Sequence, residues 1–181
     1  MDAEKQASVW TDQQAAALQR ERDGGGALGV ARMEQIAGKS GMEILSAMMS
    51  GALPSPPMNE TMNMTLLELD EGSAVFQGIP LLRHFNPMGT VHGGWFATLL
   101  DSALGCAVQT TLPAGQSYTT VELSVNIVRA ASQQTGPLRA AARVLHRGSQ
   151  MATAEASIKD ESGRLYAHAT TTCFVFKAPV D

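Results

Sequence analysis

One stretch decides the fold of this chain: residues 86–106 read NPMGTVHGGWFATLLDSALGC. Asn86-Pro87 and Gly89 are turn formers, and the residues from Trp95 to Val108 are almost all apolar or small. A helix that is hydrophobic on every face is normally buried, because no side of it favours contact with water. We therefore predict a turn that leads into a buried central helix.

Asp101 is the only charged residue of this apolar run. A lone carboxylate in an apolar helix costs free energy unless it is paired or hydrogen-bonded, so its presence indicates a function. Two plainer interpretations stay open at this point. Asp101 could be exposed on a helix that is merely poor in charge, and Gly93-Gly94 could be a flexible lead-in to that helix.

The composition limits the class of protein. A chain of 181 residues with 44% hydrophobic residues suits one domain with a sizeable core. The net charge of −4 gives no general attraction to nucleic acid. Cys106 and Cys173 have no paired spacing, so we expect neither a disulfide framework nor a metal site, and they fit a reducing compartment. Because we find no leader-like start and no apolar run of membrane-spanning length, we expect a cytoplasmic protein without a membrane partner.

Residues 1–54 are expected to form a helical N-terminal extension. Residues 3–22 are rich in helix-forming residues and polar over much of their length, which indicates a solvent-facing arm without a catalytic role. A second helix is expected over about 28–37, and a third begins after Ser40, a plausible N-cap, and reaches Gly51. Pro54-Ser-Pro-Pro57 then serves as the linker into a core domain over residues 55–181.

The core domain alternates apolar and polar residues in six segments, which predicts strands over about 62–69, 73–79, 118–129, 138–147, 150–160 and 164–177. In the third segment, Val121, Leu123, Val125 and Ile127 are expected on one face, and Thr120 on the other. Short glycine-containing turns predict that the last four strands form an antiparallel meander. The expected class is α+β, with one antiparallel sheet wrapped around the central helix.

Three spaced elements then resemble one known family. The pattern Asn86-x5-His92-Gly93-Gly94-x6-Asp101, the long strand over residues 119–129 and the turn Arg147-Gly148-Ser149 are similar to the signature of hotdog-fold thioesterases of the phenylacetate-degradation type. The similarity covers about residues 55–178. It implies a hotdog fold and hydrolysis of an acyl-coenzyme A thioester by a homo-oligomer. No separate cofactor is implied, because coenzyme A is part of the substrate.

Hydrolysis of a thioester needs a polarised carbonyl and a base or nucleophile. The N–H of Gly93 at the start of the helix is our oxyanion-hole donor, and Asp101 is either the nucleophile or the general base. The side chain of Asn86 could be a second donor or could orient the nucleophilic water, and Asn86 could also be only a turn residue before Pro87. His92 completes the catalytic set, although a position beside the glycines suits it better to shaping the loop.

The remaining candidates would bind substrate. Gly94 belongs to the substrate-binding loop, and Ser102 and Thr98 lie within a helical turn of Asp101 and could hydrogen-bond it. The acyl pocket is expected to include Trp95, Phe85 and Met88. The coenzyme phosphates call for cations and backbone amides, and the candidates are Arg129, Arg147, Gly148 and Ser149, whereas Arg164 is better read as a surface residue.

Helix length bears on the oligomeric state. Gly93 and Asp101 are eight residues apart, which is ~12 Å along a helix, whereas reacting atoms must lie within ~3.5 Å of one another. One chain is therefore not expected to supply both groups, and the site would straddle the interface of a homodimer or of a dimer of dimers. Two other functions remain open: a non-catalytic acyl-CoA-binding protein of the same fold, and a hydratase, which would favour a paired Asp and His on the helix.

Overall fold

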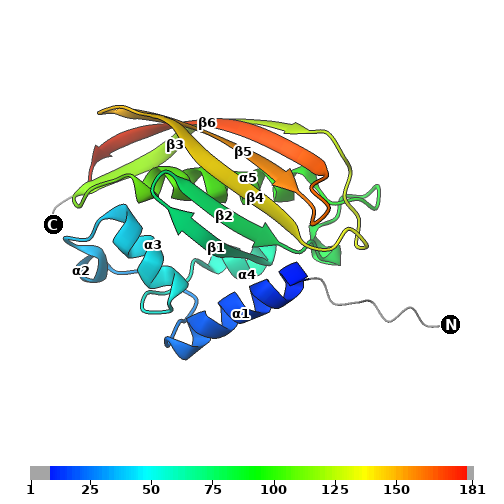
Figure 1. The fold of residues 1–181 in the computed structure, drawn as a ribbon, viewed down its shortest axis with the longest axis horizontal. Helices are drawn as coiled ribbons and strands as arrows, with labels where there is room; N and C mark the ends of the chain where they lie inside the picture. Colours follow the sequence, from blue (N-terminus) through cyan, green and yellow to red (C-terminus); the bar gives the residue numbers. More distant parts are fainter. Residues whose placement is uncertain (1–8, 179–181) are drawn as a thin grey trace.

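The computed structural model describes residues 9–178 of the chain, and in that part six strands form one antiparallel sheet that curves around a long helix (Figure 1). The helices are α1 Val9–Asp23, α2 Met33–Ile36, α3 Gly41–Met49, α4 Pro57–Met62 and α5 Gly93–Thr110, with a short 3₁₀ turn over Leu82–His84. The strands are β1 Met64–Asp70, β2 Ser73–Gly78, β3 Gln116–Ile127, β4 Leu138–Arg147, β5 Met151–Lys159 and β6 Leu165–Lys177.

Helix α5 is the centre of the core. Ten of its 18 residues are buried, and Leu100 and Leu104 are completely enclosed. The sheet supplies small alanine side chains opposite the helix, such as Ala140 and Ala154, which let the backbone of the strands come close to α5. The hotdog fold and the α+β class are thus confirmed. No helix within residues 9–178 has the length and hydropathy needed to cross a membrane.

The order of the strands differs from the expected meander. The sheet runs β1-β2-β4-β5-β6-β3, so β4, β5 and β6 form a meander of three strands, and β3 pairs with β6 at the far edge. The segment 128–137 therefore crosses from one edge of the sheet to its middle. This part of the prediction was wrong because adjacency in sequence does not fix which edge a strand joins.

A β-bulge in β3 corrects the expected division of its faces. The register with β6 shifts between Thr120 and Glu122, so Val121 is an extra, exposed residue. Thr120 therefore points to the same side of the sheet as Leu123, towards α5, and not to the opposite side. Bulges of this kind often re-aim a side chain next to a functional site.

The N-terminal helices pack against the core. The expected helix over 3–22 is α1, whose residues before Val9 lie outside the described part; its inner face buries Gln14 and Ala17, so the solvent-facing arm was a wrong interpretation. The third helix begins after Ser40 as predicted, with Glu43 completing a capping box. The second is only the single turn of α2, and the proline linker starts an unpredicted helix, α4, because proline is well suited to a first helical position.

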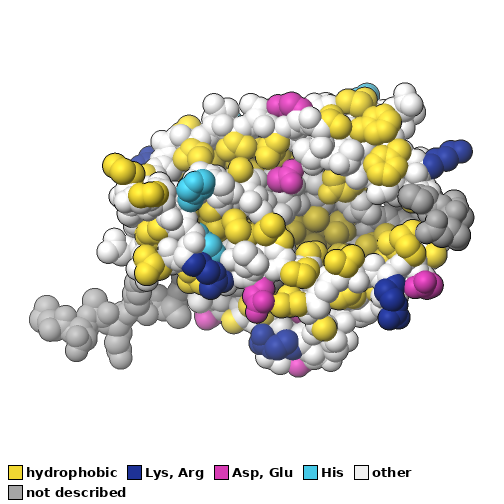
Figure 2. Space-filling view, turned by 180° about the vertical axis from the view of Figure 1, so that it is seen from behind, with side chains coloured by type: hydrophobic (Ala, Val, Ile, Leu, Met, Phe, Trp, Pro, Cys, Tyr) yellow, Lys and Arg dark blue, Asp and Glu magenta, His cyan; other side chains and the backbone are white. Residues whose placement is uncertain are grey.

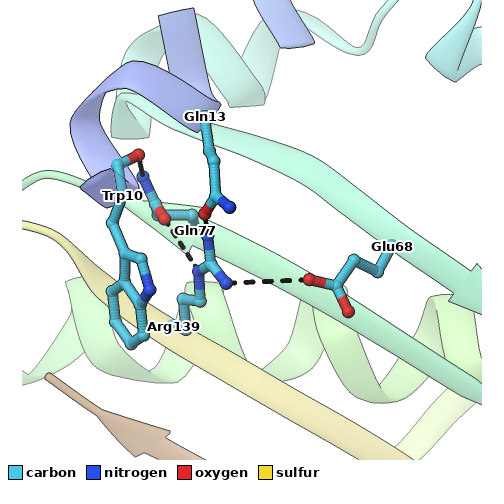
Figure 3. Close-up of polar contacts among 5 residues, drawn as sticks. All are labelled: Trp10, Gln13, Glu68, Gln77 and Arg139. Carbon is cyan, nitrogen blue, oxygen red and sulfur yellow. Dashed lines mark hydrogen bonds and ion pairs between the residues drawn. The ribbon is translucent and has the colours of Figure 1, made fainter. Parts of the chain in front are cut away.

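A polar cluster attaches α1 to the outer face of the sheet (Figure 3). The side-chain amide of Gln77 on β2 donates to the carbonyl of Trp10 at 2.6 Å and accepts from Arg139 Nε at 2.9 Å. The guanidinium of Arg139 lies 4.2 Å from the Trp10 ring centroid, donates to Gln13 and pairs with Glu68 at 3.6 Å. These contacts satisfy the polar atoms that α1 covers, which explains how a largely polar helix packs on the sheet.

We predict that Gly105→Ala destabilises the protein by about 1–3 kcal/mol, although alanine favours helices. A Cβ at this position would lie 2.2 Å from the hydroxyl oxygen of Tyr118. Urea unfolding of Gly105→Ala, of Tyr118→Phe and of the double variant measures the coupling between the two sites. The double variant should recover part of the loss, and strictly additive effects would contradict the clash.

Candidate active site

The loop before α5 is organised by Asn86. Its Oδ1 accepts the backbone N–H of Met88 at 2.9 Å and that of Thr90 at 3.2 Å, while its amide donates to Thr90 Oγ1 at 2.9 Å. Gly89 closes the turn with a φ of +79°, a conformation that suits glycine. The structure thus places Asn86 as a turn residue, and a role in orienting water stays a prediction.

His92 forms the N-cap of α5. Its ring Nδ1 accepts the N–H of Gly94 at 2.8 Å, and its carbonyl accepts the N–H of Trp95 at 3.0 Å. Within residues 9–178, by contrast, nothing accepts the N–H of Gly93. Because the first N–H groups of a helix carry partial positive charge, Gly93 presents the kind of donor that an oxyanion requires. His92 is placed to shape that donor, and chemistry at its ring stays a prediction.

Asp101 lies two turns further along α5 and is half-buried. Its Oδ1 accepts a hydrogen bond of 3.1 Å from the hydroxyl of Thr120 on β3. Thr98, expected to bond Asp101, instead donates to the carbonyl of Gly94 at 2.9 Å, as threonines in helices often do. Thr120 was missed because alternation places it on the outer face; only the bulge at Val121 turns it inwards.

The groups around Asp101 stay uncharged at neutral pH. Burial raises the pKa of Cys106 to about 12, and the charge of Asp101 adds to the rise. Burial also raises the pKa of Tyr118 well above its usual value, and that of the Cys173 thiol above its own. Among the described residues, no Lys, Arg or His pairs with Asp101, and no three His, Cys, Asp or Glu side chains group as a metal site. Among residues 9–178, the carboxylate of Asp101 therefore has neutral side chains as its immediate neighbours: Thr120, Cys106, Tyr118 and Cys173.

A cavity of about 630 Å³ lies beside the carboxylate. Asp101, Ser102 and Cys106 of α5 line it, together with Tyr118 of β3. The space-filling view from behind shows a recess with hydrophobic side chains at its floor (Figure 2). A volume in the range of ~300–1,000 Å³ is typical of small-molecule sites.

The residues expected to form the acyl pocket lie elsewhere. Trp95 is 2% exposed, and its indole N–H donates to the carbonyl of Met62 at 2.9 Å, so it is a core residue. Phe85 packs against the core, and Met88 is 86% exposed at the tip of the loop. None of the three lines the cavity. They were suggested because they are close to the glycines in the sequence. The residues of α5 that line the cavity are instead in the middle of the helix.

The expected coenzyme contacts are divided between the two ends of β3. Arg129 follows the end of β3, where its Nε donates to the Leu165 carbonyl at 3.3 Å. Arg147 lies at the start of β3, where it donates to Gln116 at 2.5 Å, and its buried Nε has no partner in the described residues. A strand of 12 residues spans about 40 Å, so one chain does not bring these cations together.

Three residues of two turns complete the expected set. The turn after β4 has the hairpin geometry predicted, with the N–H of Gly148 donating to the Met151 carbonyl at 2.8 Å, and Ser149 is exposed beside it. Arg164 is exposed in the next turn, where its N–H donates to Asp160 at 3.0 Å. That position agrees with its interpretation as a surface residue, whereas phosphate binding by Gly148 and Ser149 stays a prediction.

Comparisons with known proteins identify the family and the fold of this chain. Residues 88–167 match the model of the thioesterase superfamily. A phenylacetic acid degradation-related protein from Ralstonia eutropha JMP134 is 30% identical, with a TM-score of 0.66 over 71% of this chain and 97% of that one. A variant of the phenylacetic acid degradation protein PaaI from Thermus thermophilus is 28% identical, with a TM-score of 0.59 over 65% and 97%. The 1,4-dihydroxy-2-naphthoyl-CoA hydrolase of Listeria monocytogenes is 26% identical over 66% of this chain and 96% of its own.

The chain belongs to the thioesterase superfamily and is a thioesterase of the hotdog fold. The matched segment includes Gly93, Asp101 and Thr120, and thus the whole of the helix start, the carboxylate and its hydrogen-bond donor. It begins at residue 88, so it does not include helices α1 to α4. The proposed catalytic residues on α5 and β3 therefore lie in the part that this chain shares with the family, whereas the N-terminal helices lie outside it.

We predict that Cys106 resists alkylation in the folded protein. A thiol with a pKa raised to about 12 stays protonated far below that pH, and the thiolate is the reactive form. At pH 8 its reaction with iodoacetamide, followed by peptide mass spectrometry, should be about a thousandfold or more slower than that of free cysteine. The rate should rise with pH, and protein unfolded in urea is the control. Labelling of native Cys106 at the rate of free cysteine would contradict this account.

Proposed function

We propose that this thioesterase hydrolyses acyl-coenzyme A, and that Asp101 is the catalytic carboxylate. The observation that carries the proposal is the placement of Asp101: its carboxylate accepts a hydrogen bond from Thr120 and opens onto a cavity of small-molecule size in a thioesterase fold. Even a half-buried charge is costly when it has no cationic partner among the described residues, so a structural role alone does not account for it.

Asp101 is suited to either of two routes. As a general base it takes a proton from water, whose oxygen attacks the thioester carbonyl; the carbon–sulfur bond breaks and the coenzyme leaves as a thiolate that then gains a proton. As a nucleophile it attacks the carbonyl itself, the carbon–sulfur bond breaks and the coenzyme leaves as a thiolate that gains a proton; water then hydrolyses the resulting anhydride to the free acid and restores the Asp101 carboxylate. In both routes Thr120 orients the carboxylate through Oδ1, which leaves the other oxygen for the reaction. Cys106 takes no part as a nucleophile, because its raised pKa keeps it protonated.

The oxyanion donor comes from a second copy of the chain. The N–H of Gly93 is suited to stabilise developing charge on the carbonyl oxygen, a contact worth roughly 3–4 kcal/mol in other acyl-transfer enzymes. Along α5 it lies ~12 Å from Asp101. A homodimer, alone or within a dimer of dimers, would instead place the Gly93 of one chain opposite the Asp101 of the other, with two sites per dimer.

The free edge of β3 supports this arrangement. Within residues 9–178, β3 has a partner strand on one side only, and Val121 and Ile127 are exposed along it. Gly93 lies beside the end of β3, since a Cβ on it would be 3.1 Å from the side chain of Ile127. Asp101 lies beside the first half of β3, where Thr120 donates a hydrogen bond to it. If two β3 strands pair antiparallel about an axis beside Leu123, residue 127 of one meets residue 120 of the other. The two catalytic groups then approach each other across the interface.

The same pairing explains the separated cations. The start of β3 in one chain would lie beside the end of β3 in the other, which brings Arg147 of one chain towards Arg129 of its partner. Such a pair, with the amide of Gly148 and the hydroxyl of Ser149, would suit coenzyme phosphates. We further propose a cytoplasmic location, which the free thiols of Cys106 and Cys173 support.

We predict that Asp101→Asn lowers kcat at least about 100-fold with the fold retained, because a nearly isosteric amide neither accepts a proton nor attacks as a carboxylate does. Thr120→Val should cost about tenfold, the value of one hydrogen bond to a charged group. Thr119→Val is the matched control, since the neighbouring side chain is exposed. Thiol release from a panel of acyl-CoA thioesters measures all four proteins.

Near-parental turnover by Asp101→Asn would remove this carboxylate from the mechanism. A parent protein that binds acyl-CoA in calorimetry but releases no thiol would instead be a non-catalytic acyl-CoA-binding protein.

A further inference from the structure

The cavity beside Asp101 has two walls of different origin. The inner wall belongs to α5 and the sheet, and includes Asp101, Tyr118 and Phe76. The outer wall belongs to α1, α3 and α4, all of which contact β1, while α3 and α4 also contact α5 (Figure 1). Its hydrophobic side chains are Ala17, Leu18, Leu45, Met48, Met49 and Met58.

The outer wall is fixed in place. At its far end, α1 and α3 meet through glycines: a Cβ on Gly24 would lie 1.8 Å from the Ser50 carbonyl oxygen, and one on Gly51 would lie 2.0 Å from that of Glu21. At the other end, the polar cluster around Gln77 attaches α1 to the sheet. The start of α3 is bound to the end of α5 by the N–H of Gly41, which donates to the Leu112 carbonyl at 2.9 Å.

The chemistry of the lining indicates what the cavity holds. Flexible, unbranched methionines adapt to a chain of variable shape, and Met48, Met49 and Met58 supply half of the hydrophobic residues named for the outer wall. Besides Asp101, the charged lining residues are Arg22, Glu60 and Arg83, which are exposed and mark a rim, and Glu21, which is half-buried at the end of α1. An apolar interior with a carboxylate at one side is suited to an aliphatic chain whose thioester lies at Asp101.

The size of the cavity exceeds what a small acyl group needs. At ~30 Å³ for each water-sized group, about 630 Å³ has room for about twenty such groups. A benzoyl, phenylacetyl or butanoyl group would leave most of that volume without contacts. A long aliphatic chain would fill it and bury its methylenes, each of which favours binding.

The outer wall lies outside the family match, which begins at residue 88. The Ralstonia protein is covered over 97% of its own length but matches only 71% of this chain. This chain therefore has residues beyond the part that it shares with that relative. Because the outer wall lies outside the family match, we expect the substrate preference of this chain to differ from that of relatives without such a wall.

We propose that helices α1, α3 and α4 form the acyl-binding wall of this enzyme, and that its substrates are coenzyme A thioesters of long aliphatic acids. The proposal rests on the function proposed above. It assigns to the N-terminal extension the selection of chain length, and it leaves the chemistry to Asp101.

The proposal is tested by placing a larger side chain in the outer wall, where it would occupy part of the cavity. Leu18→Trp should lower the ratio of kcat/KM for dodecanoyl-CoA over butanoyl-CoA at least tenfold, because the indole takes the space of the distal methylenes. Ala16→Trp is the matched control: it lies on the same helix, is exposed and does not line the cavity, so the ratio should stay within twofold of the parent. The parent itself should favour dodecanoyl-CoA over phenylacetyl-CoA at least tenfold. Circular dichroism checks folding, and Met49→Trp replaces Leu18→Trp if that variant does not fold.

A measurement of binding without turnover distinguishes a failure of the acyl-binding wall from a failure of the proposed function. Calorimetry in the Asp101→Asn background measures the affinity for dodecanoyl-CoA without turnover, and Leu18→Trp should weaken it at least tenfold. If Leu18→Trp and Met49→Trp both leave the kcat/KM ratio and the affinity for dodecanoyl-CoA unchanged, the proposed acyl-binding wall is wrong. A parental preference for phenylacetyl-CoA would also contradict it. In either case, hydrolysis of an acyl-CoA would still support the proposed function. If no acyl-CoA is hydrolysed but dodecanoyl-CoA binds and Leu18→Trp weakens the binding, the function fails and the wall stands.

Discussion

The burial of α5 is the constraint on which the rest of the structure depends. A helix without a polar face must be covered on several sides, and the sheet, α3 and α4 all lie against it. Asp101 is the exception to its apolar character, and it is stabilised by a hydroxyl on β3. That hydrogen bond joins the one charge on the helix to the edge strand, and so connects the core, the cavity and the proposed interface.

Local patterns predicted the elements well. Continuous hydrophobicity identified α5, Ser40 with Glu43 identified the start of α3, and short glycine turns identified the hairpins of β4, β5 and β6. These signals are local, because caps, turns and periodicity depend on neighbours within a few residues. The catalytic candidates Gly93 and Asp101 followed from the same helix pattern, although their roles stay predictions.

Long-range contacts were not predictable in the same way. No local pattern indicates that β3 joins β6, or that a bulge at Val121 turns Thr120 inwards. The packing of α1 was missed because its buried side includes Gln14, which looks solvent-exposed until its partner Gln77 is known. The errors about Thr120 and α1 have one physical cause: the half-buried Thr120 and the buried Gln14 are hydrogen-bonded to partners that are distant in sequence.

The function then depends on which surfaces meet at Asp101. Within one chain the carboxylate faces a cavity whose outer wall comes from α1, α3 and α4, so binding of the acyl group is an internal property of the fold. The oxyanion donor is not internal, because the spacing along α5 separates Gly93 from Asp101 by ~12 Å. The central claim of this account is therefore that the acyl pocket belongs to one chain and the catalytic site to two.

Complementation between two inactive variants tests that claim most directly. Asp101→Asn removes the carboxylate, and Gly93→Pro removes the N–H donor at a first helical position that tolerates proline. Equal amounts of the two variants, unfolded and refolded together, should regain about a quarter of the parental activity. On random pairing about half of the dimers contain one chain of each variant, and each such dimer has one intact site of two. No recovery, with mixed dimers shown to form by native mass spectrometry, would mean that one chain builds the whole site.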